Sequence, residues 1–236
     1  EGGAFTLSGW LEPAASIGGD TFDYSVARET LHFSITDAMG HGVASALTAT
    51  LGVGSLRNTR RAGHSLTEQA DAASAAVAQH APARGAFITA VLGRLDLRTG
   101  VCALVNAGHL PPLLVRDGDP QPVQLPRNFG LGMFPESANH AGEVALRPGD
   151  RLVVLTDGAR ERNAAKLDLP AQLRSIAGLH PREAVRALAD AVLAVAGPTL
   201  PDDATLLIID WHGHHRKPRH TNAGADRCAA TSTGAR

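Results

Sequence analysis

The sequence feature that most constrains this chain is a series of acidic residues beside short apolar runs. Asp37 follows the apolar run 31–36 and opens the segment Asp-Ala-Met-Gly-His-Gly. A carboxylate at the end of a strand supplies negative charge, and glycines behind it let the backbone approach a ligand closely. Similar acids stand next to glycines or apolar runs elsewhere in the chain: Asp20, Asp157, Asp202 and Asp203. Because the pattern recurs along the sequence, we take these acids as the main functional signal.

Composition and charge exclude several classes of protein. The chain has 236 residues, 44% hydrophobic but only 4% aromatic, so we expect a core of alanine, valine, leucine and isoleucine. A net charge of −1 gives no general reason to expect nucleic acid or an anionic membrane as a partner. Two cysteines make no disulfide framework, so we expect a cytoplasmic protein. No apolar run approaches the roughly 20 residues of a membrane-spanning helix.

The order of the expected elements favours an α+β domain with largely antiparallel sheets. Residues 43–61 and 66–80 are expected to form a helix pair, because the second segment starts with the capping-box pattern Ser65-Leu-Thr-Glu68. The polar stretch 160–169 stays ambiguous. Apolar runs bounded by turn residues predict strands at 5–11, 21–27, 31–36, 86–97, 101–106, 113–115, 143–146, 151–156 and 204–211, with a further helix at 181–196.

The chain divides into one expected domain, residues 1–211, and a tail, residues 212–236. The tail is basic and contains four histidines among small residues, a composition typical of a flexible, disordered segment. Its histidines at 212, 214 and 215 are a weaker candidate metal site. The sequence begins close to a strand without a signal-peptide pattern, which favours a domain taken from a longer chain.

Acids that converge on one rim of a sheet structure would form a carboxylate-rich site. Oxygen donors without sulfur select hard cations such as Mg²⁺ or Mn²⁺, and several carboxylates do not stay ionised together without cations. Two such ions can hold a phosphate ester and activate water for an in-line displacement. The sequence has no Gly-x-Ser-x-Gly segment and no P-loop, so activated water is the expected nucleophile. His41 is a candidate acid, or it orders the turn.

The ordered motifs resemble those of the metal-dependent protein phosphatase (PPM) family, in its bacterial SpoIIE-like branch. The resemblance covers about residues 11–211, and it depends on the order of the motifs because each motif alone is weak. The motifs are Gly18-Gly19-Asp20 with Phe22-Asp23-Tyr24, Asp37-x-x-Gly40-His41-Gly42, Phe87-x-Thr89, Asn106-Ala107-Gly108-His109 before Pro111-Pro112-Leu113-Leu114, Gly130-Leu131-Gly132, Leu146-x-Pro148-Gly149-Asp150, Leu155-Thr156-Asp157-Gly158-x-x-Glu161 and Asp202-Asp203-x-Thr205.

The resemblance implies a four-layer αββα sandwich of two mainly antiparallel sheets flanked by helices, with a two-metal site between the sheets. It implies two Mn²⁺ or Mg²⁺ ions, with Asp37 bridging both and Asp20 binding one directly or through water. Asp203 is the less favoured acid of its pair. The residues that the resemblance assigns to the metal site are Asp20, Asp37, the backbone carbonyl of Ala38, Asp157 and Asp202.

The resemblance also implies an activity, which is hydrolysis of phosphoserine or phosphothreonine with Asp37 and His41 as catalytic residues. The implied substrate is a phosphorylated anti-sigma-factor antagonist, a component of bacterial signal transduction. The branch further implies a homodimer and an upstream sensor domain that acts on the helix pair 43–61 and 66–80. No nucleic-acid or membrane partner is expected.

Alternatives remain for the function and for single residues. A phosphatase-like binding module would hold a phosphoprotein without turnover, although the presence of all four acids argues against it. A metal-dependent phosphodiesterase or nucleotide hydrolase has less support, because no base-stacking aromatic cluster or glycine-rich phosphate loop is present. Structural roles are favoured for His109 at a strand end, for Asp23 on the surface or behind the site, and for Asp150 in a turn.

Overall fold

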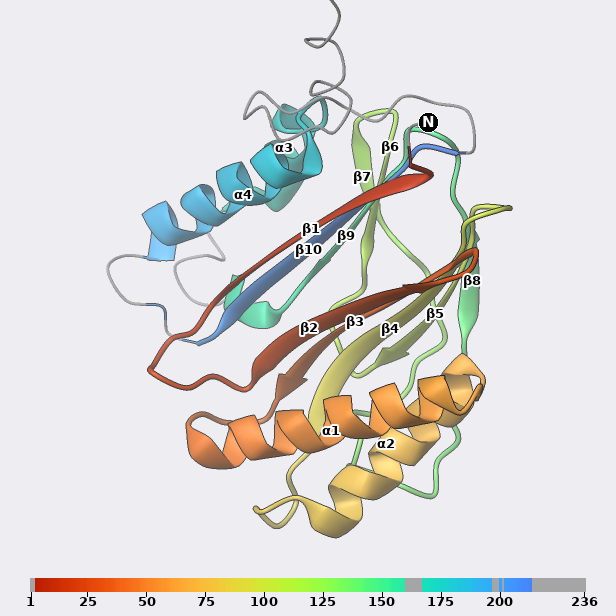
Figure 1. The fold of residues 1–236 in the computed structure, drawn as a ribbon. Coiled ribbons are helices and arrows are strands. Elements are labelled where there is room, and N and C mark those ends of the chain that lie inside the picture. Colours follow the sequence, from red (N-terminus) through yellow and green to blue (C-terminus); the bar gives the residue numbers. More distant parts are fainter. Residues whose placement is uncertain (1–2, 160–166, 197–199, 201, 214–236) are drawn as a thin grey trace, which may run out of the picture.

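Two five-stranded sheets stack face to face, and two helices cover the outer face of each sheet (Figure 1). The computed structural model describes residues 3–159, 167–196, 200 and 202–213. The first sheet has the strand order β1-β10-β9-β6-β7, and the second has the order β2-β3-β4-β5-β8. All pairings between these strands are antiparallel. The expected four-layer αββα sandwich is therefore confirmed.

The chain passes back and forth between the two halves of the sandwich, with groups of consecutive elements in each half. The first sheet consists of β1 (Phe5–Glu12), β10 (Ala204–Trp211), β9 (Arg151–Leu155), β6 (Leu113–Arg116) and β7 (Asp119–Pro122). The second consists of β2 (Asp20–Ala27), β3 (Thr30–Ala38), β4 (Ile88–Asp96), β5 (Val101–Ala107) and β8 (Gly142–Ala145). The helices are α1 (Val43–Arg61), α2 (Leu66–His80), α3 (Leu169–Ser175), α4 (Pro181–Ala196) and the short 3-10 helix η1 (Asp157–Ala159). Helices α1 and α2 cover the second sheet, and α3 and α4 cover the first (Figure 1).

Three apolar layers hold the sandwich together, and β10 belongs to two of them. Leu206 and Ile208 pack toward α3 and α4, whereas Leu207 and Ile209 pack between the two sheets. This alternation follows from the period of two in a strand that is buried on both faces. The third layer lies between the second sheet and α1 and α2. Consecutive residues of β10 therefore belong to different layers, which fixes the register of this strand.

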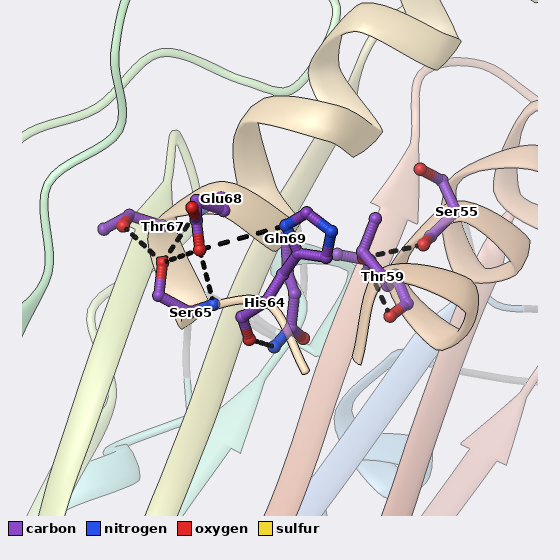
Figure 2. A network of polar contacts seen from close by, with 8 residues as sticks. Ser55, Thr59, His64, Ser65, Thr67, Glu68 and Gln69 are labelled. Atoms are coloured by element: carbon purple, nitrogen blue, oxygen red, sulfur yellow. Dashed lines mark hydrogen bonds and ion pairs between the residues drawn. The ribbon is translucent and has the colours of Figure 1, made fainter. Parts of the chain in front are cut away.

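The junction between α1 and α2 forms as the sequence predicts (Figure 2). The Ser65 hydroxyl accepts a hydrogen bond from the Glu68 backbone N–H at 3.3 Å, and the Glu68 carboxylate accepts one from the Ser65 backbone N–H at 2.7 Å. This capping box satisfies two of the unpaired donors at the helix start. The Gln69 amide donates to the His64 carbonyl at 2.8 Å and closes the junction. The bounds of both helices agree with the prediction.

Two segments differ from the prediction in ways that physical reasons explain. β3 continues through Ala38, so Asp37 lies inside the strand and not in the turn that follows it. β7 is an edge strand with two prolines, which weaken the strand pattern but are tolerated where the N–H faces no neighbour. α3 arises at the end of the ambiguous polar stretch, where the Asp168 carboxylate accepts from the Ala171 N–H at 3.0 Å.

The last described residues belong to the sandwich. His212 is buried; its backbone N–H donates to the Ala4 carbonyl at 2.8 Å, and its ring Nε2 lies 2.7 Å from the Thr6 hydroxyl. The rest of the predicted tail, residues 214–236, lies outside the described residues, as does the segment 160–166 with Glu161. Within the part of the chain that the structure describes, no helix has the length and apolar character needed to cross a membrane.

Candidate active site

The four predicted acids lie at one end of the sandwich, where both sheets end (left in Figure 1). Asp20 is the first residue of β2 and stands directly opposite Asp37 of β3 in the antiparallel register. Asp157 begins η1 after β9, and Asp202 precedes β10. Because β9 and β10 are antiparallel neighbours, the end of one and the start of the other share an edge. Two acids therefore come from each sheet.

Asp20 links the two sheets. Its carboxylate Oδ2 accepts hydrogen bonds from the hydroxyls of Thr156 at 2.8 Å and Thr205 at 2.7 Å, both of which belong to the first sheet's end of the site. Burial raises the pKa of Asp20 to about 8, and the charge of Asp37 adds to the rise. In the sequence the two threonines stand out only as members of the motifs. Thr156 directly precedes Asp157, and Thr205 follows Asp203 by two positions. This proximity to an acid is the available sequence signal for their role.

Asp37 lies at the centre of the carboxylate cluster. Burial raises its pKa to about 7, with further contributions from the charges of Asp157, Asp202 and Asp203 and from a hydrogen bond with Asp157. Burial also raises the pKa of Asp202, to which the charge of Asp157 adds. None of the ion pairs found among the described residues involves these carboxylates. Within the described residues, no ion pair therefore balances the negative charge that the cluster carries when its carboxyls ionise.

Asp203 has a structural role that its neighbour Asp202 does not share. It is buried, and its carboxylate accepts from the backbone N–H groups of Ala14 at 2.8 Å and Gly19 at 2.6 Å. A Cβ atom at Gly18 would meet this carboxylate, and one at Gly158 would meet the Asp203 backbone. Asp203 thus fastens the β1–β2 loop to the start of β10, which leaves Asp202 as the acid available to a ligand.

His41 lies in the turn between β3 and α1. The turn contains Gly40 and Gly42 with φ values of 86° and 81°, a region that favours glycine. His41 is exposed. It is close enough to Asp202 for its charge to favour the ionised carboxylate, although burial dominates and raises the Asp202 pKa. The structure thus places His41 beside the cluster, with its side chain open to solvent.

His109 connects the two sheets behind the cluster. Its ring Nδ1 lies 2.7 Å from the Thr89 hydroxyl on β4, and Nε2 lies 3.1 Å from the Leu155 carbonyl at the end of β9. The Asn106 side chain also accepts from the His109 backbone N–H at 2.8 Å. Burial lowers the pKa of His109 to about 4, so the ring is neutral at physiological pH. A groove of about 540 Å³, lined by His109 and the segment 122–128, opens beside it.

The other acids in the motifs lie outside the cluster. Asp23 accepts hydrogen bonds from Arg57 at 2.8 Å and from Arg60 at 3.2 Å and so ties β2 to α1. Burial opposes ionisation of Asp23, but these arginines outweigh it and lower its pKa. Asp150 accepts from the Arg116 guanidinium at 2.6 Å and closes the turn before β9. Both positions agree with the structural roles expected from the sequence.

The donor chemistry of the cluster fits a hard cation. All candidate donors are carboxylate or carbonyl oxygens, the class that Mg²⁺ and Mn²⁺ prefer. Asp20 stands opposite Asp37 in the register of β2 and β3, and the Asp37 pKa is raised by burial and then by the charges of Asp157, Asp202 and Asp203. Within the described residues, no three His, Cys, Asp or Glu side chains form a closed metal-binding group.

Comparisons with known proteins agree with the architecture. Residues 27–212 match the model of the family described as Stage II sporulation protein E (SpoIIE). The crystal structure of the RsbU and RsbW domains of Rv1364c from Mycobacterium tuberculosis is 27% identical, with a TM-score of 0.78 over 91% of this chain and 61% of that chain. A structure of the PP2C phosphatase domain and a fragment of the regulatory domain of SpoIIE from Bacillus subtilis is 18% identical, with a TM-score of 0.76 over 89% of this chain and 64% of that chain.

A third structure, the SiaA-PP2C domain of Pseudomonas aeruginosa, is 20% identical, with a TM-score of 0.75 over 87% of this chain and 85% of that one. The chain thus spans less than two thirds of the length of the first two structures. The two matches at 18% and 20% identity bear on the fold alone. Since the family model covers most of the sequence, the chain belongs to the SpoIIE family, and the structural matches show that it has the PPM phosphatase fold.

Proposed function

We propose that this domain hydrolyses phosphoserine or phosphothreonine in a protein substrate and that it depends on two Mn²⁺ or Mg²⁺ ions. The observation that carries the proposal is the carboxylate cluster at the end of the sandwich, which no ion pair among the described residues neutralises, with Asp37 at its centre and its pKa raised to about 7, chiefly by burial. The residues that would hold the ions are Asp20, Asp37, the Ala38 carbonyl, Asp157 and Asp202. When bound, the ions would supply positive charge to the phosphoryl oxygens and a nucleophilic water at neutral pH.

The residues of the chain have separate tasks in this proposal. Asp37 on β3 and Asp157 after β9 bring a carboxylate from each sheet to the same end of the sandwich, and in this proposal they define where positive charge is held. Asp20 holds the two sheets together at this end through its hydrogen bonds with the two threonines. In this proposal His41, which is exposed beside Asp202, would give a proton to the departing serine or threonine oxygen. No side-chain nucleophile is required.

The proposed substrate is a phosphorylated anti-sigma-factor antagonist. Its support is the family membership and the match to a chain that combines RsbU and RsbW domains. A homodimer and an upstream sensor domain acting on α1 and α2 belong to the same proposal, as does a place in cytoplasmic signal transduction.

The test is phosphate release from a small aryl phosphate, with and without Mn²⁺, for the wild type, Asp37→Asn and Asp23→Asn. Asp23→Asn is the matched control, because it removes a carboxylate on β2 that pairs with Arg57 outside the cluster. We expect Mn²⁺-dependent release that Asp37→Asn abolishes and Asp23→Asn retains. Phosphate release that does not depend on Mn²⁺, or that Asp37→Asn retains, would refute the metal site. No release from the wild type, together with tight binding of a phosphoprotein, would indicate a binding module.

A further inference from the structure

We propose that Thr89 and His109 are positioning residues, which form a neutral polar bridge between the sheets and fix Asp157 relative to Asp37. The proposal rests on the proposed function, since it concerns the same carboxylate site. In this proposal neither residue binds the substrate or an ion. Their task is to hold the two halves of the cluster at one separation.

The first half of the bridge starts next to Asp37. Thr89 on β4 stands directly opposite Asp37 on β3 in the antiparallel register. Opposite residues in such a ladder project their side chains from the same face, about 5 Å apart. On β3, that face is the one that packs between the sheets, as Phe33 and Ile35 show. The Thr89 hydroxyl therefore points from the Asp37 position toward the first sheet.

The second half reaches the segment that carries Asp157. The His109 ring lies between the Thr89 hydroxyl, 2.7 Å from Nδ1, and the Leu155 carbonyl, 3.1 Å from Nε2. A carbonyl only accepts, so Nε2 carries the proton, and in a neutral ring Nδ1 must then accept from the threonine hydroxyl. Leu155 ends β9, two residues before Asp157. One end of the bridge, Thr89, thus stands directly opposite Asp37, and the other end, Leu155, lies two residues before Asp157.

The bridge differs from the contacts that Asp20 makes across the same edge. Asp20 is itself a cluster carboxylate, so its hydrogen bonds with Thr156 and Thr205 change with whatever its carboxylate binds. The His109 ring adds no charge, because burial keeps its pKa at about 4. It can therefore hold the sheets apart by a constant distance whether or not the cluster is ionised. Removal of the Thr89 hydroxyl would leave Nδ1 without its donor and the Asp157 segment less tightly placed.

The test compares Thr89→Val with Thr89→Ser and with a control, Thr59→Val. Valine keeps the shape of threonine and removes the hydroxyl, whereas serine keeps the hydroxyl. Thr59 is part-buried on α1 and donates its hydroxyl to the Ser55 carbonyl at 2.8 Å, away from the cluster (Figure 2). The readouts are the Kd for Mn²⁺ alone, by calorimetry on chelator-treated protein, and kcat and KM with the aryl phosphate.

We expect Thr89→Val to weaken Mn²⁺ binding about tenfold, the lower end for residues that orient metal ligands. Thr89→Ser and Thr59→Val should stay within about threefold of the wild type, and saturating Mn²⁺ should restore much of the kcat of Thr89→Val with little change in KM. A purely structural role would lower the melting temperature of Thr89→Val and leave its Kd unchanged, which would overturn the proposal. His109→Phe, which fills the ring volume without either hydrogen bond, should match Thr89→Val.

The outcomes separate this proposal from the proposed function. If the wild type binds no Mn²⁺, the metal site itself is refuted. If the wild type binds Mn²⁺ and both Thr89→Val and His109→Phe bind it equally well, only the positioning role is refuted. Failure of both variants to fold would also count against the proposal, because the bridge would then be a requirement of the fold and not of the site.

Discussion

Without bound cations, the carboxylate cluster should destabilise the folded protein. Asp37→Asn should therefore raise the unfolding free energy in the presence of a chelator. The Asp37 pKa rises from 3.8 to about 7, chiefly because of burial and then because of Asp157. Since one pKa unit corresponds to about 1.4 kcal/mol, ionised Asp37 costs about 4 kcal/mol of unfolding free energy at pH 8. Asparagine resembles the neutral acid and avoids this cost. Because neighbouring carboxyls also titrate, we expect a gain of about 2 to 4 kcal/mol.

The pH dependence gives the sign of the effect. A carboxyl whose pKa is raised on folding contributes its full stability below the unfolded pKa of 3.8 and loses it as the pH rises through about 7. At pH 5 the same relation gives a cost of only about 2 kcal/mol, so the advantage of Asp37→Asn should shrink by about half between pH 8 and pH 5. Urea denaturation with a chelator at both pH values measures it.

The control for this experiment is Asp23→Asn. Its carboxylate pairs with Arg57 and Arg60, and its pKa is lowered, so the substitution should destabilise the protein or leave it unchanged. Added Mn²⁺ should stabilise the wild type and Asp23→Asn but not Asp37→Asn. A loss of stability in Asp37→Asn, or a gain of the same size at pH 5 and pH 8, would show that Asp37 carries no electrostatic cost and would refute the reasoning.

Three further changes test other parts of the structure. Asp210→Ala should lower the unfolding free energy by about 3 to 5 kcal/mol in urea denaturation, because it leaves the buried Arg151 guanidinium without its carboxylate at 2.7 Å. Gly158→Ala should abolish phosphate release and cost about 1 to 3 kcal/mol in stability, because the new Cβ meets the Asp203 backbone; wild-type activity in this variant would contradict the packing. Burial lowers the pKa of His109 from 6.5 to about 4. The stability that the neutral His109 ring contributes is therefore fully present above pH 6.5, and up to about 3 kcal/mol of it is lost as the pH falls toward 4. His109→Gln should therefore show a shallower decline than the wild type in acid denaturation.

Helices and motif positions could be predicted from the sequence because their signals are local. The capping box at Ser65 and Glu68 set the start of α2, and the proline at 181 set the start of α4. The acids at 37, 157 and 202 were identified because each follows or precedes an apolar run. The family motifs predicted that these acids share one site, and the structure brings them to one end of the sandwich. Their role as metal ligands stays a prediction.

Contacts between the sheets could not be predicted, because they join residues far apart in the sequence. Thr205 and Asp20 are hydrogen-bonded across 185 positions, and no local pattern marks such a pair. His109 was expected to be structural, but nothing in its surroundings in the sequence indicated Thr89 and Leu155 as its partners. β7 was missed because its prolines conceal an edge strand.

The threonine contacts of Asp20 have a consequence for how the site can be observed. The Thr156 amide donates to the Thr205 carbonyl at 3.0 Å, and the Thr205 amide donates to the Thr156 hydroxyl at 2.9 Å. Both residues are buried, so their amide protons exchange with solvent only when this edge of the sandwich opens. Hydrogen exchange at these two amides therefore measures the opening of the site directly, and a cation that binds the cluster should slow it in the absence of any substrate.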